Sequence, residues 1–135
     1  MITKLHHIAV VVKNLDEALA MYDNLFGLKP TKVATVPSQG VKAALLPIGE
    51  TEIELLEPID PNSGVAKFLA AKGEGMHHIC LQTDNVAADL NALGAKGVAL
   101  IDKTPRMGLA GNVGFMHPKS TKGVLIELAT PVEGH

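Results

Sequence analysis

Four side chains that can bind a metal ion recur at matching places in the two halves of the chain. The first half offers His7 and Glu54, and the second offers His78 and Glu127. Imidazole nitrogen and carboxylate oxygen suit divalent ions such as Mn, Fe, Co, Ni or Zn, and two carboxylates nearly neutralise one such ion. Both glutamates lie in apolar runs, where a carboxylate is costly unless it is paired or metal-bound. The pattern therefore predicts a site for one divalent cation.

Each half carries two adjacent histidines, so His6 and His77 compete with His7 and His78 for the ligand role. Successive residues of a strand point to opposite faces of a sheet, so only one histidine of each pair can face a common ion. Spacing alone leaves this choice open, and any single histidine could equally be an ordinary structural residue. His117 has no counterpart in the first half, so we interpret it as a pocket-lining or structural residue.

The two halves of the chain form an internal repeat. Residues 4–14 align with residues 75–85 without a gap, at an offset of 71, and both segments contain His-His-Ile. At the same offset residues 41–47 fall on 112–118, and the Ile-Glu-Leu triplet at 53–55 recurs in the second half after two extra residues. The chain therefore consists of two copies of one module, each offering one histidine early and one glutamate late.

The first copy has the pattern of a strand, a helix and three further strands. Residues 5–12 are a β-branched run. Asn14, which follows, can cap a helix, and Glu17 three residues later completes a capping-box pattern. Gly27 suits the left-handed end of that helix. The remaining strand candidates are residues 31–36, 41–47 and 52–57.

The second copy repeats this order. A helix begins at Asp84 or Asn85 and closes at Gly94 and Gly97. Strands are predicted near Val98, Val113 and Val124, and residues 61–72 predict a linker helix between the copies. We expect one domain, with module one at residues 1–60, the linker helix at 61–73 and module two at 74–135.

Composition excludes several classes of function. Of the 135 residues 47% are hydrophobic and 19% charged, which is typical of one compact globular domain. A net charge of -2 and only four Phe and Tyr residues argue against nucleic-acid binding. The apolar runs are too short for a membrane span and no signal peptide is recognisable, so we expect a cytoplasmic protein. A single cysteine, Cys80, rules out an internal disulfide and leads us to expect no sulfur ligand.

These residues resemble the vicinal oxygen chelate (glyoxalase/bleomycin resistance/dioxygenase) superfamily, and within it the methylmalonyl-CoA epimerases are the most similar family. The resemblance covers almost the whole chain. Its motifs are LHHIAVVV at 5–12, IELLEP at 53–58, VAKFL at 65–69, GMHHI at 75–79, FMHPKS at 115–120 and KGVLIEL at 122–128. It implies an α+β fold in which two tandem βαβββ modules form an open, barrel-like mixed sheet with the metal site in the cleft.

The resemblance also implies a ligand set and a reaction. His7, Glu54, His78 and Glu127 would hold a divalent ion (Co, Mn, Ni or Zn), and Glu127 would act as a base. The implied activity is an isomerase that removes and returns the α-proton of methylmalonyl-CoA through a metal-stabilised enolate. Where some relatives carry a second acidic residue this chain has Ala43, which leaves the second base open.

The implied partners are an acyl-CoA substrate and a second copy of the chain. The basic residues around the 108–114 loop could meet the coenzyme A phosphates, although solvated surface positions are the more ordinary interpretation. They are Lys103, Arg106, Lys119 and Lys122. Two alternatives remain, which are a glyoxalase I (lactoylglutathione lyase)-type isomerase and a non-catalytic small-molecule binding member of the superfamily.

Overall fold

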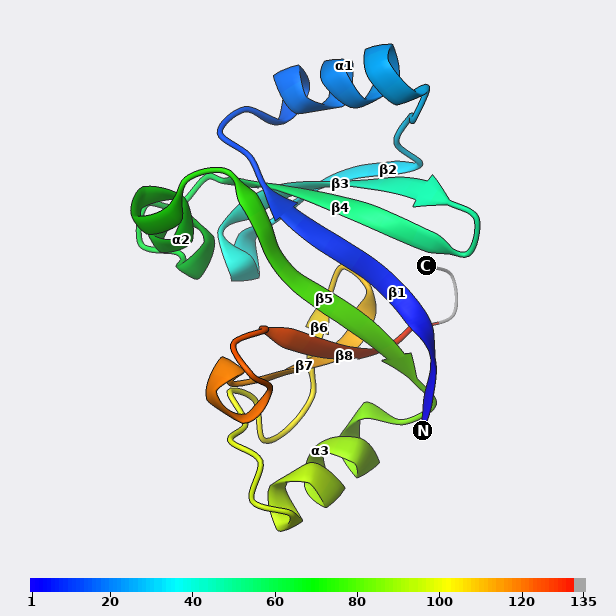
Figure 1. Ribbon diagram of the computed structural model, residues 1–135, viewed down its shortest axis with the longest axis vertical. Helices are drawn as coiled ribbons and strands as arrows, with labels where there is room; N and C mark the ends of the chain where they lie inside the picture. The colour runs from blue at the N-terminus through cyan, green and yellow to red at the C-terminus, as the bar shows by residue number, and fades with distance from the viewer. Residues whose placement is uncertain (133–135) are drawn as a thin grey trace. The chain divides into compact units, whose positions relative to one another are not determined.

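The computed structural model describes residues 1–132 (Figure 1). Its contacts divide the chain into two compact units. The N-terminal unit comprises residues 7–77, and the C-terminal unit comprises residues 1–6 together with the chain from His78 onward. Among the described residues no helix is long and apolar enough to cross a membrane.

The N-terminal unit contains the first βαβββ module and the linker helix. Its elements are β1 (Ile2–Val11) from His7 on, α1 (Leu15–Phe26), β2 (Lys32–Val36), a 3₁₀ turn (Pro37–Gln39), β3 (Val41–Ile48), β4 (Thr51–Pro58) and α2 (Gly64–Lys72). The strands lie in the order β2-β3-β4-β1. Pairing is antiparallel from β2 to β4 and parallel between β4 and β1. The crossover through α1 makes the parallel pair possible.

Helix α1 covers one face of this unit's strands. The side chain of Asn14 accepts a hydrogen bond from the Glu17 backbone N–H at 2.9 Å, which is the predicted cap. The helix ends at Gly27, whose φ of 69° is left-handed as expected. The apolar face of α1 packs on Leu46 and Leu55. Residues on the opposite face of these strands therefore do not belong to the α1 core.

The C-terminal unit repeats the arrangement. Its elements are β5 (Gly75–Thr83) from His78 on, α3 (Val86–Ala95), β6 (Arg106–Gly108), β7 (Gly111–Met116), a 3₁₀ turn (Pro118–Ser120) and β8 (Ile126–Thr130). The strands lie in the order β5-β8-β7-β6, with β5 and β8 parallel. Asn85 caps α3 by accepting from the Ala88 N–H at 3.0 Å. The helix packs on Met116 and Leu128.

The α+β class with tandem βαβββ modules is confirmed, with one correction to the repeat. Strand pairing sets Leu45 opposite Glu54 and Phe115 opposite Glu127, so the equivalent residues of β3 and β7 are 70 apart. The offset of 71 between segments 41–47 and 112–118 was wrong by one residue. Because side chains alternate along a strand, that shift decides which residues share the glutamate's face.

The strand predicted near Val98 is not formed. Only an isolated bridge joins Leu100 to Met116, and the second strand of the second module, β6, begins at Arg106. The carboxylate of Asp102 accepts the Phe115 backbone N–H at 2.9 Å, so a side chain takes the place of a ladder bond there. The last strand begins at Ile126, two residues after the predicted Val124.

Candidate metal and acid–base site

The N-terminal unit holds a buried histidine–glutamate pair. His7 on β1 and Glu54 on β4 approach with Nε2 and Oε1 3.5 Å apart, and their side chains are 1% and 8% exposed. Strand register places Ala9 opposite Glu54, so His7 and Glu54 lie on the same face of the sheet. This is the face opposite to α1, because Leu55, the residue after Glu54, packs in the α1 core.

The C-terminal unit holds the equivalent pair. His78 Nε2 on β5 lies 3.1 Å from Glu127 Oε1 on β8, and the two side chains are 5% and 6% exposed. The ring of Phe115 meets the His78 ring edge-on, with centroids 5.1 Å apart. Because Phe115 is also the strand neighbour of Glu127, it forms one wall beside the pair.

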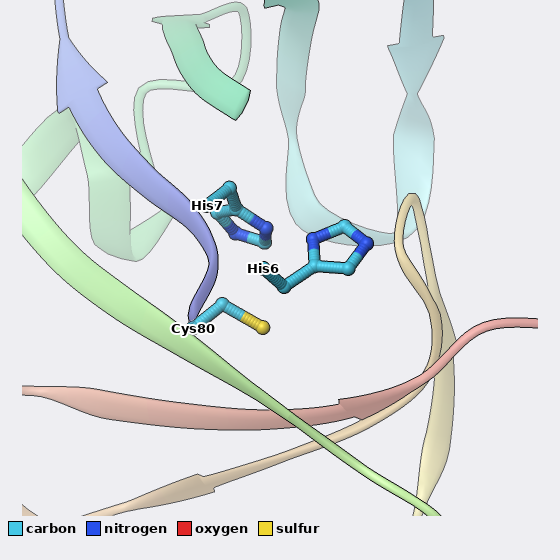
Figure 2. Close-up of side chains that lie close together, drawn as sticks. All are labelled: His6, His7 and Cys80. Carbon is cyan, nitrogen blue, oxygen red and sulfur yellow. The ribbon is translucent and has the colours of Figure 1, made fainter. Parts of the chain in front are cut away.

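The geometry distinguishes between the adjacent histidines within each unit. His7 is fully buried and His78 is 6% exposed, and each lies beside its glutamate. His77 is only half-buried and packs edge-on against Phe68, with centroids 4.9 Å apart. His6 is also half-buried, and Figure 2 shows its ring next to that of His7 on β1. The structure thus places His7 and His78 in the two histidine–glutamate pairs.

The donor set of each pair fits a first-row divalent ion. Each unit supplies one imidazole nitrogen and one carboxylate oxygen, from side chains that are at most 8% exposed. Such atoms are the usual protein ligands of Zn, Mn, Co and Ni. A buried carboxylate beside an imidazole is also an arrangement suited to proton transfer.

Other predicted residues take different places. His117 Nδ1 accepts the Lys119 N–H at 3.0 Å at the start of the 3₁₀ turn, which is a structural role. Ala43 is 1% exposed and lies opposite Leu56, so it is on the same face as Glu54. An acidic side chain at this position would share the Glu54 face, and Ala43 leaves only a methyl group there.

Two residues on these faces had not been predicted. Glu52 lies opposite His7 in the β1–β4 ladder, and its Oε2 is shielded from solvent with no hydrogen-bond partner among the described residues. Cys80 is fully buried opposite Glu127. Figure 2 shows its thiol near His6. Our expectation that sulfur is unavailable was too strong, because one cysteine can still lie on a ligand-bearing face. Strand parity with Glu54 and with His78 was the signal that could have found both residues.

Comparison with protein families identifies the class. Residues 6–117 match the model of the glyoxalase/bleomycin resistance protein/dioxygenase superfamily. The match spans most of the chain, and it agrees with the paired βαβββ modules and their histidine–glutamate pairs. The chain therefore belongs to this superfamily.

Within the superfamily the chain is similar to methylmalonyl-CoA epimerases. It is 39% identical over 129 residues to the mitochondrial methylmalonyl-CoA epimerase of Dictyostelium discoideum, covering 94% of this chain and 78% of that protein. A solved structure of the Streptomyces coelicolor methylmalonyl-CoA epimerase in complex with 2-nitronate-propionyl-CoA is 36% identical. Its TM-score is 0.95, and the match covers 98% of this chain and 97% of that one.

A methylmalonyl-CoA epimerase structure in complex with methylmalonyl-CoA and NH4+ is also 36% identical to this chain. Its TM-score is 0.95, and the match covers 98% of this chain and 97% of that one. The resemblance to the epimerases, and the prediction of an isomerase related to them, are thereby confirmed. All three proteins are named methylmalonyl-CoA epimerases. The two solved structures are complexes with an acyl-CoA substrate or analogue.

Proposed function

We propose that the chain is a metal-dependent methylmalonyl-CoA epimerase, which interconverts the (R) and (S) forms of methylmalonyl-CoA at C2. The observation that carries the proposal is the buried histidine–glutamate pair, present once in each module. The similarity to epimerases of that substrate supports the choice of reaction.

In this proposal His7, Glu54, His78 and Glu127 hold one divalent cation. Both pairs have the right donor atoms, and the two carboxylates would nearly cancel the charge of the ion. When bound, the cation would supply Lewis-acid stabilisation of the negative charge that develops on the thioester carbonyl oxygen. Low exposure of all four side chains keeps water from competing for these donor atoms.

Glu127 is the residue that we assign to proton transfer at C2. Its carboxylate is 6% exposed and lies 3.1 Å from His78, so it is held in one place on the sheet face. A positioned carboxylate of this kind contributes roughly 10²–10⁴-fold to the rate of proton abstraction. Inversion also requires a proton to return on the opposite side of C2, and the methyl group of Ala43 cannot deliver it.

The proposal is tested by following exchange of the C2 proton of methylmalonyl-CoA by NMR in deuterated buffer. The protein is first stripped with EDTA and then supplied with Co²⁺ or Mn²⁺. We expect exchange and loss of optical purity only with added metal. His78→Ala should abolish exchange, because it removes one donor and leaves Glu127 without its imidazole neighbour at 3.1 Å.

The matched control is His77→Ala. His77 is the neighbouring residue of the same strand, points to the opposite face of the sheet and packs edge-on against Phe68. This variant should retain exchange, and circular dichroism should show that both variants are folded. Exchange that persists in His78→Ala, or wild-type protein that remains inactive with every metal, would refute the proposal.

The alternatives appear as other outcomes of the same measurements. Turnover of the hemithioacetal of methylglyoxal and glutathione, without epimerase activity, would make the chain a glyoxalase I-type isomerase. Stoichiometric binding of a planar drug by the metal-free protein, without turnover of either substrate, would make it a binding member of the superfamily.

A cytoplasmic location and a homodimer belong to the same proposal. The single, fully buried cysteine is compatible with a reducing compartment. Leu25 and Phe26 at the end of α1 are 62% and 64% exposed, and apolar side chains of this size are common at subunit contacts. Light scattering of the purified protein would report the mass of a dimer.

A further inference from the structure

Arg106 presents a cation on the face that carries His78 and Glu127. It begins the edge strand β6 and lies opposite Val113 in the β6–β7 ladder. Val113 in turn lies opposite Ala129 on β8, two residues after Glu127. Residues paired across strands share a face, and so do residues two apart along a strand. Arg106 and Glu127 are therefore on the same side of the sheet in this unit.

The guanidinium of Arg106 is held by Asp102. Arg106 Nε donates to Asp102 Oδ1 at 3.1 Å, while Oδ2 of the same carboxylate accepts the Phe115 N–H at 2.9 Å. One carboxylate thus ties the arginine to strand β7. Among the described residues no hydrogen bond uses the terminal Nη atoms of Arg106. With the side chain 43% exposed, both NH₂ groups can receive a ligand.

Phe115 connects this cation to the metal-binding histidine. The guanidinium carbon lies 5.4 Å from the Phe115 ring centroid, and that centroid lies 5.1 Å from the centroid of His78. The two distances together place the guanidinium within about 10.5 Å of the His78 ring. A small acyl group bound at His78 is therefore within reach of the arginine.

Charge balance in the proposed site calls for such a cation. Glu54 and Glu127 would already offset the two positive charges of the ion, whereas the substrate adds a free carboxylate and develops further negative charge at C2. Arginine is suited to this position because its planar fork binds a carboxylate through two parallel N–H bonds. The coenzyme A phosphates are the poorer match, since the pantetheine arm holds them far from the thioester.

We propose that Arg106, positioned by Asp102 over Phe115, binds the free carboxylate of the acyl group and makes the site selective for carboxylated acyl-CoAs. This inference rests on the proposed function, because it concerns the same site. Asp102 is a positioning residue, which acts on the bound carboxylate through Arg106.

The test compares the affinity of the Mn²⁺-loaded protein for methylmalonyl-CoA and for propionyl-CoA, which lacks the carboxylate, by calorimetry. Arg106→Gln should weaken methylmalonyl-CoA binding by about 10- to 100-fold, the range for a lost charge-assisted hydrogen bond, while propionyl-CoA binding is unchanged. Arg106→Lys should recover part of the loss, because it keeps the charge but not the fork. Asp102→Asn should reduce the same preference with a smaller effect, and propionyl-CoA binding should stay unchanged.

Lys96→Gln is the control, since Lys96 is an exposed cation at the end of α3 and should leave both affinities unaltered. If Arg106→Gln weakened the binding of both acyl-CoAs equally, the inference would be overturned, and the arginine would lie at the phosphates or the pantetheine arm. Unchanged affinity for both acyl-CoAs would overturn it as well. Failure of the proposed function can be told apart from failure of this inference. In that case the wild-type protein would bind neither acyl-CoA, or would show no exchange at C2.

Discussion

Gly114 on β7 packs directly against Leu90 of α3, which makes it a sensitive test of the strand register. A Cβ added at Gly114 would lie 2.6 Å from Leu90 Cδ1 and 3.2 Å from Cδ2. Ordinary carbon contacts begin near 3.4 Å, and Leu90 is fully buried, so it has little room to withdraw. Overpacking of this kind costs typically 1–3 kcal/mol, about 3 to 5 °C in melting temperature for each kcal/mol in a domain of this size.

We therefore expect Gly114→Ala to melt several degrees below the wild type in a calorimetric or circular dichroism scan. Gly64→Ala is the matched control, because a Cβ at that position in the first turn of α2 meets no atom within 4 Å. It should be neutral or stabilising by about 0.4–1 kcal/mol, since alanine lowers the entropy of the unfolded chain.

A second substitution tests whether the Leu90 side chain is the atom group that the new methyl meets. Leu90→Val in the Gly114→Ala background should recover part of the lost stability, because it shortens the side chain that the new methyl group meets. Unchanged melting of Gly114→Ala, or no recovery by Leu90→Val, would mean that β7 does not turn Gly114 toward α3. The assignment of Phe115 to the opposite, histidine-bearing face would then fail with it.

Three further outcomes are expected. Saturating Mn²⁺ or Co²⁺ should raise the melting temperature of the EDTA-treated protein, and Glu54→Ala should abolish most of that rise; an equal rise in the variant would remove Glu54 from the ligand set. Glu52→Gln should raise the melting temperature of the metal-free protein, because it removes a charge from a shielded oxygen that has no hydrogen-bond partner among the described residues. A lower melting temperature would show that this carboxylate is paired in solution. Cys80 should react with Ellman's reagent only as fast as the protein unfolds, since it is fully buried, and rapid labelling of native protein would contradict this placement.

Local signals in the sequence predicted the starts of α1 and α3 and the end of α1, whereas α3 continues past the predicted Gly94 to Ala95. Asn14 and Asn85 both cap helices through their side chains, and Gly27 ends α1 in the left-handed region. These features depend on a few neighbouring residues, so spacing was sufficient to find them. The repeat likewise predicted one histidine–glutamate pair in each module.

Features that depend on pairing between distant strands were harder to predict. The one-residue error in the alignment of β3 with β7 arose because residue similarity does not report register, which alone decides that Leu45 and Phe115 share the glutamate face. The strand expected near Val98 is reduced to a single bridge between Leu100 and Met116, and beyond it the Asp102 carboxylate, not a backbone carbonyl, accepts the Phe115 N–H. Neither contact leaves a trace in local composition.

Strand β1 has a consequence for synthesis, because its two ends belong to different units. Residues from His7 onward group with the chain up to position 77, whereas the first six group with residues from His78 on. Thr3 Oγ1, for example, donates to the Gln82 carbonyl oxygen at 3.3 Å, a partner 79 positions further along the chain. Residues 1–6 can therefore reach these partners only after the chain from residue 78 on has been synthesised. Contacts between segments so far apart in sequence form late in folding.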